Sequence, residues 1–321
     1  MTRPNLILLA LLAIALPLSL LAGRVWLDPA TTPNAALILA ELRLPRALLA
    51  LIIGAGLGAA GAAMQGYLRN PLADPGLFGI APGAALGAVL ALHLGVATAI
   101  LLPVFALAGA GGAMALLALI AGRAANGPRG IALFTLAGMM IASLAGALTS
   151  LAISLAPNAF ALSAIVTWLM GALTDRGWSD VALAAPLTLA GIALLWRAGS
   201  ALDALTLGEV AARSLGVRPG RLLALMVLGT GLAVGSGVAV AGIIGFVGLI
   251  VPHLMRPLTD RRPSRLIVPS ALAGALLVLV ADVVCRLLPL VTELRLGIAL
   301  SLIGAPFFLH LLLRMRRTNI A

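Results

Sequence analysis

The run ALLALIIGAGLGAAGAAM at residues 47–64 decides the fold, because 18 uncharged and mostly apolar residues are enough to cross a bilayer as a helix. In lipid every backbone polar group must find its partner inside the segment, and a helix achieves this. Gly54, Gly58 and Ala62 follow one another at four-residue steps. Small residues at such steps let a second helix approach closely. The run therefore predicts a tightly packed membrane helix.

Similar apolar runs recur along all 321 residues, of which 62% are hydrophobic and only 10% are charged. An ordinary soluble domain carries about 25% charged residues. We expect an all-α, polytopic membrane protein with ten transmembrane helices in a single transmembrane domain over residues 1–321. The expected spans are 5–22, 46–68, 76–94, 97–121, 131–155, 181–197, 221–240, 242–257, 267–288 and 296–314.

The basic residues predict the orientation in the membrane. The net charge is +11, and all 21 basic residues are arginine. They lie between the apolar runs, which favours membrane topology over nucleic-acid binding. Ten spans put both termini on one side, and that side holds 15 of the arginines against six. The positive-inside rule then predicts that both termini are cytoplasmic. The first span lacks a small-x-small cleavage site, so we expect it to be retained.

Several kinds of chemistry are excluded or disfavoured by the composition. A Walker A loop needs a lysine, and the chain has none. The single cysteine is Cys285, and the three histidines are too scattered for a metal site. We expect no enzyme activity, no metal and no cofactor in this chain. An acid inside a span can drive ion-coupled transport, and Asp282 is the candidate. Asp282 can instead form an internal salt bridge with Arg286 one helical turn later, and the spacing favours this interpretation.

The most polar helix-like stretch is LTLGEVAARSLGVRPGR at residues 205–221. Thr206 and Glu209 have the spacing of a capping box, and Gly216 is a helix stop. Glu209 and Arg213 can pair across one turn. The pattern predicts a nine-residue amphipathic helix over residues 207–215, in a cytoplasmic loop spanning 199–220. Such a helix either rests on the membrane surface or docks a soluble partner.

Six segments together resemble the FecCD-type permease subunits of ABC importers for iron chelates and vitamin B12. They are RLPRALLALIIGAGLGAAGAAMQGYLRNPLADPGLFGIAPGAALGA (43–88), WLMGAL (168–173), LGEVAARSLGV (207–217), GFVGLIVPHLMR (245–256), ADVVCR (281–286) and IGAPFFLHLLLR (303–314). The resemblance implies a type II ABC importer permease fold that translocates an iron–siderophore-type chelate across the bacterial plasma (inner) membrane. It also implies three kinds of partner. They are a second permease chain (identical or a sister subunit), two ATP-binding subunits that hold ATP and Mg²⁺, and a periplasmic or lipid-anchored binding protein.

The resemblance also implies roles for individual residues. The ATPase-coupling residues would be Leu207, Gly208, Glu209, Arg213 and Gly216. The residues that dock the binding protein would be Arg43, Arg46 and Arg286. The cytoplasmic gate would be formed by Asn70, Leu72, Ile131 and Thr135.

Other interpretations stay open at the level of sequence. The three docking arginines could be interface anchors, and Asn70 with Pro71 could form an ordinary turn. Arg295 could add a further docking charge. The chain could be an ion-coupled secondary transporter that uses Asp282, or a membrane scaffold that transports nothing. Haem, cobalamin and molybdate are possible cargoes beside a ferric siderophore.

Overall fold

The computed structural model describes residues 3–23, 25–122 and 130–318, and every regular element in these ranges is a helix. The helices that build the bundle are α1 (Arg3–Leu21), α3 (Leu44–Leu68), α4 (Ile80–His93), α5 (Leu101–Gly122), α6 (Gly130–Ser154), α8 (Trp178–Leu205), α10 (Pro219–Ala241), α12 (Pro263–Leu287) and α13 (Leu296–Thr318). Shorter elements are α2 (Ala35–Leu37), η1 (Ile38–Arg43), η2 (Pro75–Phe78), α7 (Ala159–Leu169), α9 (Glu209–Ser214), α11 (Val247–Met255) and η3 (Arg256–Leu258).

Seven stretches of helix in the described ranges are long and apolar enough to cross a membrane: α1, the continuous run Ala35–Leu68, α5, α6, α8, α10 and α12. Four more apolar helices are shorter, and they include α4, α7 and α11. Each of the ten expected spans coincides with one helix, so the all-α prediction is confirmed. The count of ten spans stays a prediction, because length alone supports seven. The sequence did not predict α7.

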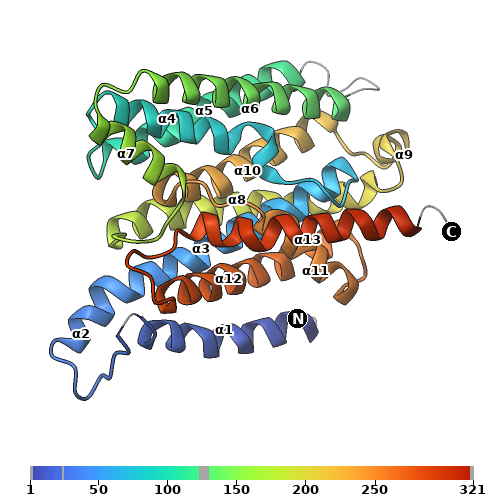
Figure 1. Ribbon diagram of the computed structural model, residues 1–321. Coiled ribbons are helices and arrows are strands. Elements are labelled where there is room, and N and C mark those ends of the chain that lie inside the picture. The colour runs from blue at the N-terminus through green and yellow to red at the C-terminus, as the bar shows by residue number, and fades with distance from the viewer. Residues whose placement is uncertain (1–2, 24, 123–129, 319–321) are drawn as a thin grey trace.

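The long helices run side by side along one direction, as Figure 1 shows. The first and last described residues lie at the same end of the bundle as α9. We call this the α9 end. The opposite end, which we call the far end, holds the connections 25–34, 170–177 and 288–295. The two groups of arginines that the sequence analysis assigned to opposite sides follow this division wherever the chain is described.

Helix α3 is the central element, and it packs against α8, α10, α11 and α12. Small residues at the predicted positions of α3 allow these helices to pack closely against it. A Cβ atom at Gly54 would overlap the carbonyl oxygen of Gly274, and one at Gly58 would overlap that of Ser270. A Cβ at Gly61 would meet the backbone of Gly248. The glycine steps of the 47–64 run therefore set the contact distance of α3 with α12 and α11.

We expect the substitution Gly54→Leu to separate α3 from α12, since the added side chain has no free space. Overpacking of this kind costs about 3 kcal/mol or more at so tight a contact. The measurement is the melting temperature and the monodisperse fraction of the purified chain in detergent. Gly146→Leu on α6 is the control, because a Cβ there meets nothing within 4 Å. Equal behaviour of the two variants would contradict this packing.

The eighth expected span, 242–257, is helical only from Val247 onward. Helix α10 ends at Ala241, its C-cap Gly242 has φ = 73°, and α11 begins at Val247 after Phe246 with φ = 66°. The Gln65 side chain donates to the carbonyl oxygens of Gly248 and Leu249 at 3.4 Å. These bonds tie the first turn of α11 to α3, so the break lies against the centre of the bundle.

Candidate functional site

Helix α9 is bracketed by two glycines that have positive φ. Gly208 precedes the helix with φ = 102°, and Gly216 follows it with φ = 88°. Residues with a Cβ are strained in this region, whereas glycine adopts it freely. The prediction that the helix ends at Gly216 is confirmed, because α9 ends at Ser214 and Gly216 has the positive φ that follows a helix end. The chain can therefore leave α8, turn once through α9 and enter α10 within a short distance.

The predicted capping box at Thr206 is wrong. Helix α8 continues to Leu205, eight residues past the expected end of the span, and Thr206 is its C-cap. The Thr206 hydroxyl donates to the Asp203 carbonyl oxygen at 2.7 Å, so it does not cap α9. The helix that follows has six residues instead of nine, because Gly208 takes the N-cap position. The connecting loop is correspondingly shorter than 199–220, since residues 199–205 belong to α8.

The charged side of α9 faces the bundle. The carboxylate of Glu209 lies 3.9 Å from the Arg213 guanidinium on the next turn and 4.0 Å from that of Arg69 at the end of α3. The predicted pair of Glu209 with Arg213 is confirmed, and Arg69 is an additional partner. This second contact joins α9 to the helix that forms the centre of the fold.

The apolar side of α9 and its flanks points away from the bundle. Leu207, Val210 and Leu215 are 66%, 80% and 65% exposed, whereas Ala212 is buried. Exposed apolar side chains that lie together commonly mark a surface for a partner or for lipid. The structure thus presents α9 as a small apolar protrusion that its own charges anchor to the bundle.

Two of the predicted gate residues lie close to α9 in space. Ile131 lines a small cavity together with Glu209, Arg213 and Tyr67. The Thr135 hydroxyl donates to the Ile131 carbonyl oxygen at 3.0 Å, which places both residues on the first turns of α6. The α9 and gate residues were assigned separately, and the fold brings them together.

The other two predicted gate residues form a turn after α3. The side-chain oxygen of Asn70 accepts a hydrogen bond from the Leu72 amide at 2.9 Å. This is the local arrangement expected of an Asx turn. Asn70 directly follows Arg69, the partner of Glu209, so the turn is connected to α9 through one residue.

An aromatic cluster links these elements. The rings of Tyr67 and Phe134 meet edge to face with centroids 5.2 Å apart, and Phe134 stacks on Phe78 at 5.1 Å. The three residues come from α3, α6 and η2. Packed aromatic rings transmit displacement between elements better than flexible chains, because interiors are close-packed. Sequence reasoning missed this cluster, since the residues are far apart in the chain.

At the far end, Arg286 does not face outward, and the expectation that it docks a partner is corrected here. Its side chain is 6% exposed. Its guanidinium donates to the carbonyl oxygens of Ser19 and Ala22 at 3.1 and 2.8 Å, and pairs with Asp282 at 3.0 Å. The cation therefore satisfies the last carbonyl groups of α1, where a positive charge is favourable.

Arg43 has a similar role in the fold. One of its nitrogens, Nη1, donates to the carbonyl oxygens of Leu20 and Leu21 at 2.8 and 2.6 Å, and Nη2 donates to that of Val25 at 3.0 Å. The side chain remains half-buried. Two of the three predicted docking arginines thus hold the end of α1, a role that the sequence analysis did not foresee.

Arg46 joins two carboxylates. Its guanidinium lies 2.9 Å from Asp282 and 2.8 Å from Glu293. Thr174 also donates to Glu293, at 3.1 Å. Burial alone would raise the pKa of Glu293, but the hydrogen bond and charge of Arg46 lower it below its ordinary value. Sequence reasoning missed Glu293, because its pairing with Arg46 spans 247 residues.

A second basic feature of the far end involves Arg295, the residue noted in the sequence as a further charge. Arg176 and Arg295 line a cavity of about 350 Å³ beside α7, with Asp175 also in its wall. The Nε atom of Arg176 and the indole nitrogen of Trp168 are buried without a hydrogen-bond partner. The far end therefore keeps basic surface even though Arg286 is turned inward.

For the residues that the structure describes, no group of three or more His, Cys, Asp or Glu side chains could hold a metal ion. The arrangement offers two features with chemical meaning. One is the anchored apolar protrusion at the α9 end, and the other is the arginine–carboxylate network at the far end.

Comparison with known proteins gives consistent matches over the chain. The model of the FecCD transport family matches residues 10–314. The uncharacterized ABC transporter permease protein YvrB of Bacillus subtilis is 41% identical over 284 residues, which cover 87% of this chain and 80% of that protein. The vitamin B12 import system permease protein BtuC of Serratia proteamaculans is 39% identical over 322 residues, which cover 98% and 94%.

A solved structure agrees with the sequence matches. It is described as an inward-facing conformation of a metal-chelate type ABC transporter, and it superposes with a TM-score of 0.88 at 33% identity. The match covers 97% of this chain and 98% of the other. With the family model spanning nearly the whole sequence, this chain belongs to the FecCD transport family.

Proposed function

We propose that this chain is the membrane permease subunit of an ABC importer, that separate ATPase subunits bind at α9, and that the cargo is an iron–siderophore-type chelate. The observation that carries the proposal is the orientation of α9, whose charges bind the bundle while its apolar residues are exposed. The names of the relatives support the transporter class, since they are an ABC transporter permease and a vitamin B12 import permease.

In this proposal the ATPase covers the apolar surface formed by Leu207, Val210 and Leu215. An exposed apolar protrusion on a rigid support suits a cleft in a soluble partner, because burial of apolar area drives association. Gly208 and Gly216 allow the sharp turns that place it there. The α9 end is then the cytoplasmic side, and both termini lie on it.

Movement of α9 reaches the proposed gate through two routes. The first is the ion pair of Glu209 with Arg69, next to the turn that holds Asn70 and Leu72. The second is the small cavity that Glu209 shares with Tyr67 and Ile131, which leads into the aromatic cluster. A displacement of α9 by the ATPase would therefore shift the end of α3 and the start of α6 together.

The far end is the proposed docking face for a periplasmic or lipid-anchored binding protein. Arg176 and Arg295 give this face its positive charge. Arg43 contributes its half-buried side chain, and Arg46 is bound to Asp282 and Glu293 just below the surface. Opposite charges across such an interface set orientation and association rate more than affinity. Arg286 acts indirectly, since it holds Asp282, which in turn positions Arg46.

The ion-coupled carrier is less well supported by the structure. Asp282 is 1% exposed, and both of its oxygens are bound by arginines. The carboxylate is thus part of the network that holds Arg46 and Arg286 in place, which gives it a structural role in this fold.

The test is affinity purification of the chain from its native membrane in mild detergent, followed by mass spectrometry. We expect a stoichiometric ATPase that carries a Walker A motif, and a second permease if the pair is made of sister subunits. Uptake of a radiolabelled ferric siderophore and of cyanocobalamin by the same cells then tests the cargo. A chain that purifies alone, under conditions that preserve other membrane complexes, would contradict the proposal.

A further inference from the structure

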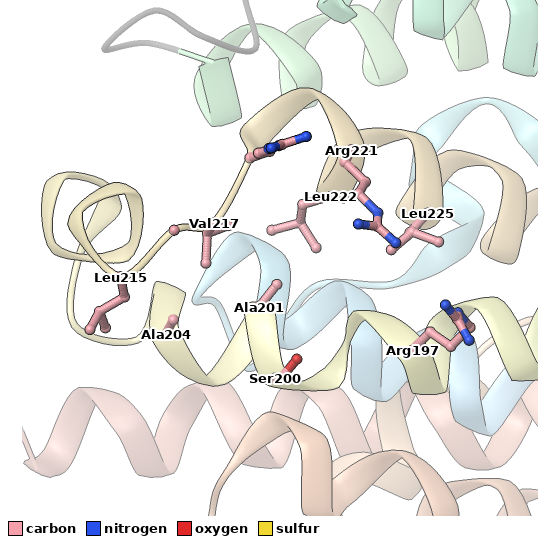
Figure 2. Close-up of a pocket in the computed structure, with 11 residues that line it drawn as sticks. Arg197, Ser200, Ala201, Ala204, Leu215, Val217, Arg221, Leu222 and Leu225 are labelled. Atoms are coloured by element: carbon pink, nitrogen blue, oxygen red, sulfur yellow. The ribbon is translucent and has the colours of Figure 1, made fainter.

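A cavity of about 620 Å³ opens at the α9 end between α8, the segment 215–218 and the start of α10. Figure 2 shows it as a gap between the two helices, closed on one side by Leu215 and Val217. Its walls come from one face of α8, with Arg197, Ser200 and Ala204 spaced by about one turn. It adjoins the small cavity that joins Glu209 to Ile131, and Val217 and Leu222 line both.

The cavity is basic and holds no acidic residue in its wall. Arg197, Arg218 and Arg221 line it. In Figure 2 the Arg221 side chain extends from α10 toward α8, the helix that carries Arg197. Over the described ranges, no hydrogen bond or ion pair is recorded for any of these three side chains. The acid nearest along α8, Asp203, is already bonded to Ser264 at 2.8 and 2.5 Å. Like charges that face one another favour an anion between them.

The backbone adds to the positive potential. Helix α10 has 23 residues, and its N-terminus opens at this cavity. Its N-cap residue Arg218 provides no side-chain cap, and Pro219 occupies the first turn. The free amides and the dipole of a long helix favour negative charge at this end. The Ser200 hydroxyl is a further donor in the wall. Arginine side chains bind phosphate oxygens with paired, charge-assisted hydrogen bonds.

The surroundings of the cavity are those of a membrane surface. Trp196, next to Arg197, is 62% exposed, and tryptophan side chains favour the level of the lipid headgroups. On α10 the wall continues from Arg221 to Leu222 and Leu225, and Leu228 is exposed one turn deeper. A charged mouth is thus followed by apolar surface along the membrane-spanning helices.

From these features we propose that the cavity binds an acidic phospholipid of the adjoining leaflet. Its phosphate would lie between Arg197, Arg218 and Arg221, and its acyl chain would lie against Leu225 and Leu228. Basic pockets between membrane helices on the cytoplasmic side are suited to such headgroups. A free phosphate would use only the charged mouth and would leave the apolar wall uncovered. The inference rests on the membrane placement in the proposed function, and not on the cargo or the ATPase.

The bound lipid would also steady α9. Leu215 and Gly216, which end the α9 segment, form part of the same wall. A headgroup bound between α8 and α10 therefore restrains the two helices that flank α9 in the chain. Bound acidic lipid would thereby limit motion of α9 relative to α8.

The experiment is native mass spectrometry of the full chain in detergent, with dioleoyl phosphatidylglycerol or dioleoyl phosphatidylcholine added at equal concentration. We expect phosphatidylglycerol to be retained roughly tenfold more than phosphatidylcholine, as expected for several arginines at a membrane surface. The double variant Arg197→Gln/Arg221→Gln should lose this preference. Arg197→Lys/Arg221→Lys should keep part of it, because the charges remain.

The matched control is Arg261→Gln/Arg262→Gln, which removes two exposed arginines at the same end but outside the cavity. It should keep the full preference, and all variants should keep the melting temperature of the parent chain. Equal loss in both double variants would overturn the proposal in favour of nonspecific attraction. Displacement of the lipid by millimolar glycerol 1-phosphate would overturn the lipid as ligand and leave a simple phosphate site. Loss of the lipid when the ATPase is bound would show that the ATPase occupies the cavity.

Discussion

Replacing Glu209 with arginine is expected to uncouple ATP hydrolysis from uptake. The change removes the contacts of Glu209 with Arg69 and Arg213, and it places three cations together. Repulsion would then move α9 away from the end of α3. A coupling free energy of about 1–3 kcal/mol corresponds to a loss of about 5- to 150-fold, and we expect uptake to fall within this range. The measurement is ATP-driven uptake by the complex reconstituted into liposomes, with ATPase activity recorded in parallel.

The control for this variant is Asp260→Arg. Asp260 is an exposed acid at the same end that lies 3.9 Å from Arg262, and it does not contact α9 in the described structure. The change reverses the same charge and should leave uptake near the parent level. Glu209→Gln should show an intermediate loss, since it removes the charge without adding repulsion. Normal uptake in Glu209→Arg would show that α9 is not the coupling element.

Replacing Asp282 with alanine is expected to destabilise the whole chain. Asp282 is the shared partner of Arg46 and Arg286, and its removal leaves a buried cation uncompensated. Breaking a buried ion pair on one side costs about 3–5 kcal/mol. The loss should also loosen the end of α1, because Arg286 would be free to leave the carbonyl groups of Ser19 and Ala22. Thermal unfolding of the purified chain in detergent measures the effect.

Glu41→Ala is the control for Asp282→Ala. Glu41 is an exposed acid near Arg43 and Arg46, so its loss should change the melting temperature little. If both variants melt like the parent chain, the network does not hold the far end together.

The variant Asp282→Asn separates the importer from the ion-coupled carrier. In the importer, any Asp282→Asn protein that folds still takes up cargo when ATP is present and the proton gradient is collapsed. In the carrier, a stable Asp282→Asn protein loses uptake. Loss of uptake in a stable Asp282→Asn protein, together with uptake by the parent chain that stops when the proton gradient is removed, would support the ion-coupled carrier instead of the importer.

Much of the fold followed from local features of the sequence. Each of the ten apolar runs lies on a helix, because backbone groups in lipid must be satisfied within the segment. The glycine steps of α3 predicted its close contacts with the neighbouring helices. Gly216 predicted the end of α9, since only glycine enters its backbone conformation freely. These signals need no knowledge of distant residues.

Helix boundaries near the candidate site could not be predicted in the same way. Thr206 and Glu209 have the spacing of a capping box, yet α8 continues to Leu205 and uses Thr206 as its own cap. Asp203 in that extension caps the start of α12 through Ser264. A contact between two helices thus extends α8, and it outweighs a local signal worth about 1 kcal/mol.

The sequence by itself determined the membrane class, the helical content, the division of the arginines between two ends and the family. Only the tertiary structure decided which charges meet: Arg286 with the end of α1, Arg46 with Glu293, and Glu209 with Arg69. The reason is physical. Apolar periodicity and backbone satisfaction are properties of one segment, whereas the partner of a buried charge depends on which helices are stacked beside it.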